Sequence, residues 1–322
     1  MRLAADVGGT KSLVALVQAN QVLAQQRYEN HPWPNLETLL LHFWHTQGSP
    51  PLLDACVAAA GPVVDNVCIL SNRVWTVDGS QIGAALGGIP VRVINDFTAV
   101  GYGLSCLQEV DLYWLQRGLP EPRGAVAFLG AGTGLGQGYA LWHQDHYRVY
   151  AAEGGHVDFA PRTPREWALR QYLLESQGLE RVSVERVVSG LGIPKIYRFL
   201  AATDPQLGRY FDPALAEDGA GISAAGDPLS VGAMEVFVQA YGAVAGNLAL
   251  TLLPRGGLYI AGGIAPQILP LLQRLGFLEA FLDKGRMRAL LSQIPVAVVC
   301  NPQVGLLGAA FYPEPIGESG LG

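Results

Sequence analysis

Two glycine-rich segments that contain a threonine are the residues of this chain whose types and spacing point most directly to chemistry. Asp6-Val7-Gly8-Gly9-Thr10-Lys11 stands near the start, and Leu129-Gly130-Ala131-Gly132-Thr133-Gly134-Leu135-Gly136 repeats the pattern in the middle of the chain. Glycine lets backbone N–H groups approach an anion with no side chain in the way. The recurrence therefore predicts two clamps for phosphate groups, one in each half, with a nucleotide between them.

Two standard phosphate-binding patterns are excluded, and a plain tight turn remains the alternative for either segment alone. The pattern G-x-x-x-x-G-K-[ST] occurs nowhere in the chain. The dinucleotide pattern G-x-G-x-x-G fails because the glycines from Gly130 to Gly138 recur at every second residue, which is typical of a strand. A third glycine stop, Gly262-Gly263, ends the apolar run Leu258–Ala261 and precedes a helix predicted after Pro266. It suits a nucleoside, and a plain turn is equally consistent.

Acidic and amide side chains follow two further predicted strands. Asn95 and Asp96 come directly after the buried run Val91–Ile94, at the strand end where ligands bind in open α/β sheets. A helix cap is the alternative for this pair. The turn Glu153-Gly154-Gly155-His156 places an acid and an imidazole together, or is merely a turn with a solvated acid. Such groups suit a substrate rich in hydroxyls, and a carboxylate is the usual base in phosphoryl transfer, so the pattern predicts a sugar kinase.

Composition limits the class of protein. The chain has 322 residues, of which 50% are hydrophobic and 15% charged, enough for two domains with their own cores. The net charge of −6 comes with no basic run, so no nucleic-acid partner is predicted. Apolar stretches are interrupted before they reach membrane length, and we expect a cytoplasmic protein with no membrane partner. The four cysteines stand singly, so we expect neither zinc nor a disulfide framework.

The elements that must position these residues occur in two similar series. Strands are predicted at Leu3–Val7, Ser12–Gln18 and Gln21–Tyr28, and again at Ala125–Leu129, Gly136–Leu141 and Tyr147–Ala151. A helix with a capping box should begin at Thr163-Pro164-Arg165-Glu166. Apolar residues at helical spacing predict a core helix from Met234 to Leu252, before Pro254.

The whole chain resembles the bacterial glucokinases of the hexokinase and actin-like ATPase superfamily. The resemblance rests on the segments above together with Ala60-Gly61-Pro62, Ile94 to Ala99, Glu153 to Ala160 and Glu185-Arg186-Val187-Val188-Ser189-Gly190. It implies an α/β fold of two actin-like (ribonuclease H-like) lobes with a duplicated βββαβαβα topology and a cleft between them. Residues 1–103 plus 302–322 would form the small lobe and 104–301 the large lobe.

The resemblance also implies an activity and the residues that carry it. The chain would phosphorylate glucose at O6 with ATP and Mg²⁺, with Asp96 as the general base. The residues expected to hold the sugar are Asn95, Asp96, Glu153, His156, Glu185 and Asn72. The residues expected around ATP are Asp6, Gly8, Gly9, Thr10, Lys11, Gly132, Thr133, Gly134, Gly262 and Gly263, with Asp6 near the magnesium shell. Glu185 comes from the resemblance alone, because it otherwise looks like a first-turn acid of a helix.

One departure and two alternatives complete the hypothesis. Kinases of the related repressor and open-reading-frame kinase group carry a C-x-C-G-x-x-G-C zinc motif, whereas Asp158 to Trp167 contains no cysteine. The chain is therefore similar to the zinc-free glucokinase branch, for which a homodimer is expected. A kinase for another hexose and a non-catalytic sugar sensor are the alternatives, and the presence of Asp96 argues against the sensor.

Overall fold

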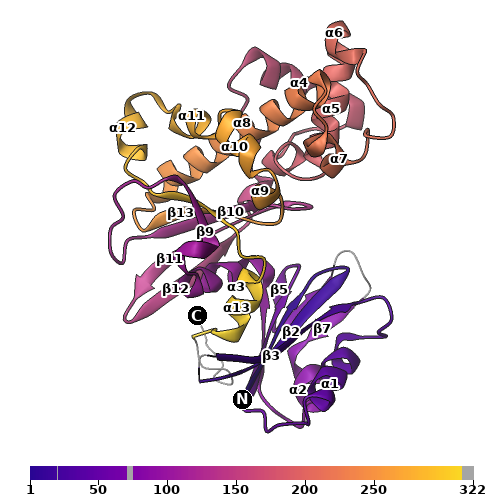
Figure 1. Ribbon diagram of the computed structural model, residues 1–322, viewed down its shortest axis with the longest axis vertical. Helices are drawn as coiled ribbons and strands as arrows, with labels where there is room; N and C mark the ends of the chain where they lie inside the picture. Colours follow the sequence, from indigo (N-terminus) through magenta and orange to yellow (C-terminus); the bar gives the residue numbers. More distant parts are fainter. Residues whose placement is uncertain (20, 71–74, 314–322) are drawn as a thin grey trace. The chain divides into compact units, whose positions relative to one another are not determined.

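The computed structural model describes residues 1–19, 21–70 and 75–313, and the chain divides into two compact units (Figure 1). Unit 1 comprises Met1–Glu109, His143–Ala151 and the described part of Asn301–Gly322. Unit 2 comprises Val110–Trp142 and Ala152–Cys300.

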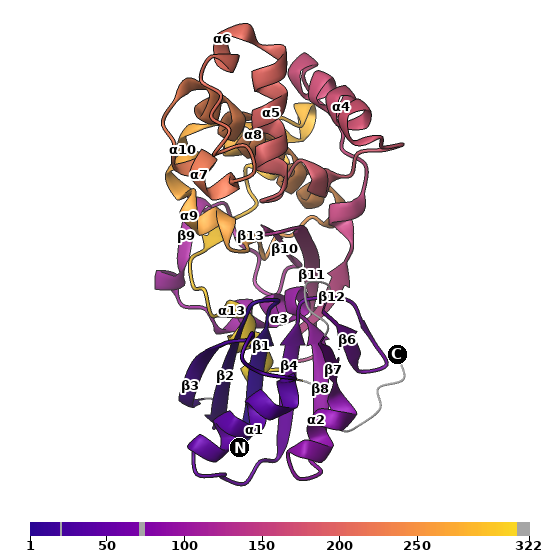
Figure 2. The same cartoon turned by 90° about the vertical axis from the view of Figure 1, so that its right-hand side faces the viewer.

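Unit 1 is built on a five-stranded sheet in the order β3-β2-β1-β4-β8 (Figure 2). Its strands are β1 (Arg2–Val7), β2 (Lys11–Gln18), β3 (Gln21–Glu29), β4 (Asp54–Ala59) and β8 (Val91–Asn95). β2 runs antiparallel to both β1 and β3, whereas β4 and β8 run parallel to β1. The three predicted N-terminal strands are confirmed, with ends that differ by one residue.

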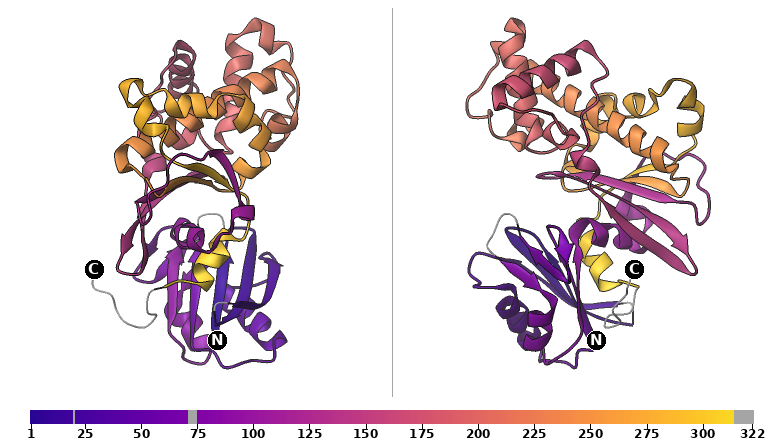
Figure 3. Two further views of the ribbon diagram at one scale, coloured as in Figure 1. Left: turned by 60° about the vertical axis from the view of Figure 1, so that its left-hand side comes forward. Right: turned by 180° about the vertical axis from the view of Figure 1, so that it is seen from behind.

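Side chains of β1 alternate between the two faces of this sheet, as the period of two in a strand requires. Leu3, Ala5 and Val7 belong to one buried cluster with Leu36 and Leu39 of α1 (Leu36–Thr46). Asp6 points to the opposite face, where α3 (Asp96–Gly103) and α13 (Val304–Ala310) lie (Figure 3). The sheet of unit 1 is therefore covered on both faces, with the carboxylate on the side of α3 and α13.

Helices α3 and α13 pack at a distance that only glycine permits. A Cβ atom at Gly103 would overlap the backbone oxygen of Val304, and one at Gly308 would overlap the backbone oxygen of Ala99. Because α3 begins with Asp96, this contact holds the helix that carries a predicted site residue.

The segment Met1–Glu109 of unit 1 also contains a small sheet, one further helix and short 3₁₀ turns. The elements are β5 (Val63–Val64), β6 (Val67–Ile69), β7 (Thr76–Asp78), α2 (Gly79–Ala85), η1 (Leu104–Cys106) and η2 (Glu109–Asp111), the last of which reaches into unit 2.

A second sheet has the order β12-β11-β10-β13-β14-β9. Most of its strands belong to unit 2, whereas nearly all of β12 and the last residue of β11 fall within His143–Ala151 of unit 1. Its strands are β9 (Leu112–Gln116), β10 (Val126–Ala131), β11 (Leu135–His143), β12 (His146–Ala152), β13 (Gly257–Ala261) and β14 (Val296–Val299). The strands β12, β11, β10, β13 and β14 repeat the order found in the sheet of unit 1. β13 runs parallel to β10, and β14 runs parallel to β13. This confirms the duplicated α/β topology. The edge strand β9, antiparallel to β14, is an addition that the sequence did not predict.

The helices of unit 2 gather on one side of its sheet (Figure 1). They are α4 (Pro164–Gln177), α5 (Gly192–Thr203), α6 (Pro205–Gly208), α7 (Gly219–Ala224), α8 (Pro228–Leu252), α9 (Ile264–Gln267), α10 (Leu269–Arg274), α11 (Phe277–Leu282) and α12 (Arg288–Leu291). Three 3₁₀ turns accompany them: η3 (Gly154–His156), η4 (Val184–Arg186) and η5 (Gly285–Met287). The helix predicted after Pro266 in fact begins at Ile264, directly after the glycine stop.

The core helix α8 is longer than predicted. It begins at Pro228, where the Asp227 side chain accepts hydrogen bonds from the N–H groups of Leu229 and Ser230 at 3.0 Å each. The prediction started at Met234 because the first turns are defined by this cap and not by apolar periodicity. The helix is long and apolar enough to cross a membrane, but 78% of its apolar window is buried inside the protein, as in a core helix.

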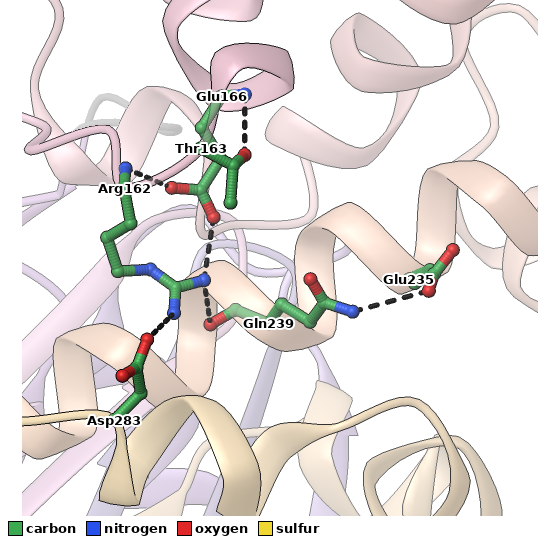
Figure 4. Close-up of polar contacts among 6 residues, drawn as sticks. All are labelled: Arg162, Thr163, Glu166, Glu235, Gln239 and Asp283. Carbon is green, nitrogen blue, oxygen red and sulfur yellow. Dashed lines mark hydrogen bonds and ion pairs between the residues drawn. The ribbon is translucent and has the colours of Figure 1, made fainter.

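The predicted N-cap Thr163 and Pro164 at the first position of α4 are confirmed, but the Glu166 carboxylate binds Arg162 in place of the N–H of the cap residue (Figure 4). Thr163 Oγ1 accepts from Glu166 N at 3.1 Å, and Glu166 Oε2 accepts from Arg162 N at 2.6 Å, one residue before the cap. Glu166 Oε1 accepts from the Arg162 guanidinium at 2.7 Å. Asp283 stands 3.8 Å from the same guanidinium and balances its charge further.

Replacement of Gly308 by alanine should destabilise the protein. The added Cβ overlaps backbone atoms, which cannot move aside as a flexible side chain would, so we expect a loss of about 3 kcal/mol or more in the free energy of unfolding. Urea unfolding followed by circular dichroism measures it. Gly226→Ala is the matched control, since a Cβ there meets nothing within 4 Å. Equal stability of the two variants would contradict the packing argument.

Replacement of Glu166 by glutamine should also destabilise the protein. The side chain of Glu166 is 4% exposed, so the variant leaves the buried Arg162 guanidinium short of its closest negative charge. Loss of one partner of a buried pair typically costs about 3 kcal/mol. Glu121→Gln, which removes the exposed partner of Arg255, should change thermal stability by less than about 1 kcal/mol. A similar effect of both variants would show that burial of the pair does not matter.

Candidate functional site

The ends of three parallel strands place the predicted residues of unit 1 at one edge of its sheet. Asp6 is in register with Ala58, and Ala59 is in register with Asn95. Since β1, β4 and β8 run parallel, Asp6, the Gly61 turn and the Asn95-Asp96 pair all lie at their carboxyl ends.

The helix-cap alternative for the Asn95-Asp96 pair is correct for Asn95. Its Oδ1 accepts from the N–H groups of Phe97 and Thr98 at 2.9 and 3.2 Å, so Asn95 is the N-cap of α3. Its Nδ2 donates to the backbone oxygen of Gly61 at 3.0 Å and to Asp96 Oδ1 at 2.9 Å. Asn95 is therefore both a cap and a positioning group for Asp96.

Asp96 is the first residue of α3, and its carboxylate is oriented by its neighbours. Oδ1 also accepts from Phe97 N at 2.8 Å. The unpaired N–H groups at a helix N-terminus carry partial positive charge, which favours an anion at this place. The geometry holds a carboxylate in one orientation at the strand edge.

Asp6 lies at the same edge of the sheet, and the charge of Asp96 affects its pKa. Burial, together with the negative charge of Asp96, raises the pKa of Asp6 to about 6. On the other side, a Cβ at Gly305 would lie 2.6 Å from Asp6 Oδ2, so a larger residue there would displace the Asp6 carboxylate. Two carboxylates held close together are a donor set suited to a divalent cation or its water shell.

The first glycine-rich turn connects β1 to β2 and is held from behind by a residue that the sequence analysis missed. Gly8 N donates to Lys11 O at 3.0 Å. The buried Asn30 donates from Nδ2 to Gly8 O at 2.8 Å and from its backbone to Thr10 O at 2.8 Å. The signal in the sequence was a polar residue directly after the third strand. The Lys11 ammonium pairs with Glu29 at 3.3 Å on the neighbouring strand.

The second glycine-rich turn connects β10 to β11, and the Glu185 carboxylate packs against this turn. Leu135 N donates to Glu185 Oε2 at 2.9 Å, and a Cβ at Gly134 would collide with the same oxygen. Gly190 N donates to Gly132 O at 2.7 Å, so both ends of the segment that contains Glu185 are tied to this turn. Gly132 itself has open space where a Cβ would stand.

The turn Glu153 to His156 also rests on β11. A Cβ at Gly155 would collide with the backbone oxygen of Leu135, which explains a glycine in a buried position. The side chains of Glu153 and His156 are 81% and 57% exposed, and Glu153 Oε2 stands 3.8 Å from His156 Nε2. The acid and the imidazole are thus presented together on the surface of unit 2.

A cavity of about 480 Å³ in unit 2 brings together three predicted residues from separate segments, Thr133, His156 and Glu185. Its other lining residues are Gly178, Leu179, Glu180, Arg181, Ser183, Arg186, Ser189, Leu191 and Lys195. Three of these are cations that the sequence analysis missed, because Arg181, Arg186 and Lys195 form no run in the sequence. Glu153 is not among the residues that line it.

The third glycine stop lies beside the second turn. β13 pairs in parallel with β10, with Gly130 opposite Ala261. Gly262 has φ +80°, and a Cβ there would stand 2.6 Å from the backbone oxygen of Ala131. Gly263 has nothing within 4 Å of the place of a Cβ. The two turns therefore offer neighbouring stretches of open backbone.

The contacts described above concern neither the predicted sugar residue Asn72 nor a metal site of three or more side chains. Asn72 lies outside the residues that the structure describes. Within residues 1–19, 21–70 and 75–313, no group of three or more His, Cys, Asp and Glu side chains is arranged to hold a metal ion.

Comparison with known proteins agrees with this geometry. The family model described as glucokinase matches residues 3–315. A curated glucokinase of Nostoc punctiforme is 46% identical over 332 aligned positions, which cover 96% of this chain and 97% of the relative.

Solved structures share the fold. A glucokinase from an Antarctic psychrotroph superposes with a TM-score of 0.82 at 28% identity, covering 96% of this chain and 97% of the other. A ROK family glucokinase from Streptomyces griseus, in complex with glucose and AMPPNP, has a TM-score of 0.62 at 20% identity and covers 96% and 97%. The match to the family model and the identity to the Nostoc enzyme, both over nearly the full chain, show that the chain belongs to the glucokinase family.

Proposed function

We propose that Asp96 is the general base of this enzyme, which phosphorylates glucose with ATP. The observation that carries the proposal is the orientation of the carboxylate at the start of α3, where Asn95 Nδ2 and Phe97 N both donate to Oδ1. A base must be held in one place relative to the hydroxyl that it deprotonates. Asp96 meets that requirement through contacts within unit 1 alone.

In the proposed reaction, Asp96 accepts the proton of the glucose 6-hydroxyl. The O6 oxygen then attacks the terminal phosphorus of ATP, and the bond from that phosphorus to the bridging oxygen breaks. The products are glucose 6-phosphate and ADP. The partial positive charge at the N-terminus of α3 favours the ionised, proton-accepting form of the base.

We assign the sugar hydroxyls to Glu153, His156 and Glu185, with Asn72 as a further sugar residue. Carboxylates accept from hydroxyl groups, and an imidazole nitrogen either donates or accepts. Asn95 was expected among these groups, but both N–H bonds of its amide are used within unit 1. We therefore assign Asn95 the role of positioning Asp96, with a direct sugar contact as a lesser part.

We assign the phosphates of ATP to the two glycine-rich turns and the nucleoside to Gly262 and Gly263. Gly8, Gly9, Thr10, Lys11, Gly132, Thr133 and Gly134 supply backbone N–H groups, hydroxyls and one ammonium. Mg²⁺ would neutralise phosphate charge when it is bound. Asp6 fits its water shell, because burial and the charge of Asp96 leave this carboxylate in need of a nearby cation.

Three assignments beyond the site belong to the same proposal. The small lobe of the enzyme would comprise residues 1–103 plus 302–322, and the large lobe residues 104–301. The enzyme would act in the cytoplasm and assemble as a homodimer. These assignments rest on the resemblance to bacterial glucokinases.

Asp96→Asn should strongly reduce turnover and preserve glucose binding. The amide keeps the size of the carboxylate but accepts no proton, so we expect kcat to fall by about 10² to 10⁴. Glucose affinity measured by isothermal titration should stay within about tenfold of the parent, equivalent to roughly 1.4 kcal/mol.

The matched control for this variant is Asp78→Asn. Asp78 also stands at a helix start in unit 1 and caps α2 through Ser80 N at 2.8 Å. Asparagine caps equally well, so this variant should keep full turnover. Normal turnover of Asp96→Asn would remove Asp96 from the mechanism. Loss of both glucose binding and folding would limit Asp96 to a structural role.

Asp6→Asn should change the pH dependence of stability in the absence of metal and nucleotide. The folded pKa of about 6 lies above the ordinary aspartate value of 3.8, so the folded state holds this proton more tightly than the unfolded state. The contribution of Asp6 to stability is therefore present at low pH and is lost as pH rises through the folded pKa. The free energy of unfolding of the parent minus that of the variant should fall by roughly 1 to 3 kcal/mol between about pH 4 and pH 7. Parallel curves for the two proteins would refute the raised pKa.

A further inference from the structure

Lys195 is a cation in the cavity of unit 2 to which neither the sequence nor the family match assigns a role. It is one of three lysines in the chain, the others being Lys11 and Lys284. It lies in the first turns of α5, is half-buried, and lines the same cavity as Thr133 and Glu185. A half-buried ammonium that faces a cavity needs a compensating partner.

The other cations of this cavity already have partners within unit 2. Arg181 Nη1 donates to His156 O at 2.9 Å and to Asp158 Oδ1 at 3.1 Å. Arg186 Nη1 donates to Gln177 Oε1 at 3.1 Å. For Lys195, no carboxylate oxygen among the described residues lies within the 4.0 Å of an ion pair.

The surroundings of Lys195 are electrostatically unfavourable for its charge. Burial lowers the pKa of Lys195, and the positive charges of Arg186 and Arg198 lower it further. Glu185 acts in the opposite direction, but its Oε2 already accepts from Leu135 N. An anion in the cavity would relieve this arrangement, since it would bring a negative charge to the Lys195 ammonium.

The segment that leads into α5 is bound to the second glycine-rich turn. Gly190 N donates to Gly132 O at 2.7 Å, and Ser189, one residue earlier, lines the cavity. Ser189 Oγ accepts from Gly192 N at 3.1 Å and so connects this contact to the start of the helix. The position of Lys195 is thereby coupled to the turn that carries Thr133.

We propose that Lys195 binds a phosphate group of the nucleotide donor. The proposal rests on the assignment of the Thr133 turn to phosphates in the proposed function. A neutral sugar would satisfy hydrogen bonds but would leave the charge of Lys195 uncompensated, whereas a polyphosphate brings charge of the required sign. Lys195 thus acts as a specificity residue for the anionic donor.

The kinetic test uses Lys195→Met, which keeps the length of the side chain and removes its charge. We expect the KM for ATP to rise about tenfold or more, as for the loss of a hydrogen bond between charged groups. The kcat and the KM for glucose should stay within about threefold, because binding that is equal in ground and transition states affects KM alone. Lys195→Arg should restore most of the ATP affinity.

Lys284→Met is the matched control. Lys284 is also half-buried in unit 2, and burial likewise lowers its pKa, but it does not line the cavity. Its variant should leave all three kinetic constants unchanged.

Chemical labelling tests the same ammonium in the unaltered enzyme. Pyridoxal 5′-phosphate condenses with an unprotonated amine with loss of water, and borohydride reduces the imine to a stable secondary amine. We expect labelling at Lys195 that ATP prevents and glucose alone does not, with labelling of Lys284 unaffected by either. With three lysines in the chain, peptide mapping assigns each label.

The outcomes separate this proposal from the proposed function. An unchanged KM for ATP in Lys195→Met, no labelling of Lys195, or protection by glucose alone overturns the role of Lys195 and leaves the kinase assignment intact. Absence of ATP-dependent glucose phosphorylation by the unaltered enzyme instead overturns the assignment on which the proposal rests.

Discussion

Contacts too close to admit a Cβ atom are the constraint on which the site depends. Gly134 admits the Glu185 carboxylate to the second turn, and Gly155 lets the Glu153 to His156 turn rest on the backbone of β11. In unit 1, Gly308 sets the distance between α13 and the helix that begins with Asp96. Because protein interiors are densely packed, these contacts allow little movement, and the backbone geometry determines where the functional side chains lie.

Charge is distributed locally in a way that the net charge of −6 conceals. Unit 1 holds Asp6 and Asp96 near each other. Burial of Asp6 and the negative charge of Asp96 both raise the pKa of Asp6. Unit 2 lines its cavity with Arg181, Arg186 and Lys195. The two carboxylates of unit 1 suit a divalent cation or its water shell, and the cations of the unit 2 cavity suit an anion.

Much of the fold was predictable because its signals are local. Strand periodicity and glycine turns predicted both three-strand series, and the N-cap at Thr163 appears where the sequence places it. The start of α8 was missed because a cap at Asp227, and not apolar spacing, defines it. The edge strand β9 was missed because its pairing with β14 joins segments that are far apart in the chain.

The sequence by itself determined the duplicated α/β topology and the residue types at the strand ends, because each depends on neighbours a few positions away. Only the tertiary structure decided that the Asn95 amide reaches the backbone of Gly61 and that Asn30 holds the first turn through the backbone of Gly8. It also decided that Lys195 shares a cavity with Thr133. Those relations join side chains that no local pattern connects, and they exist only after parallel strands and packed helices have brought distant segments together.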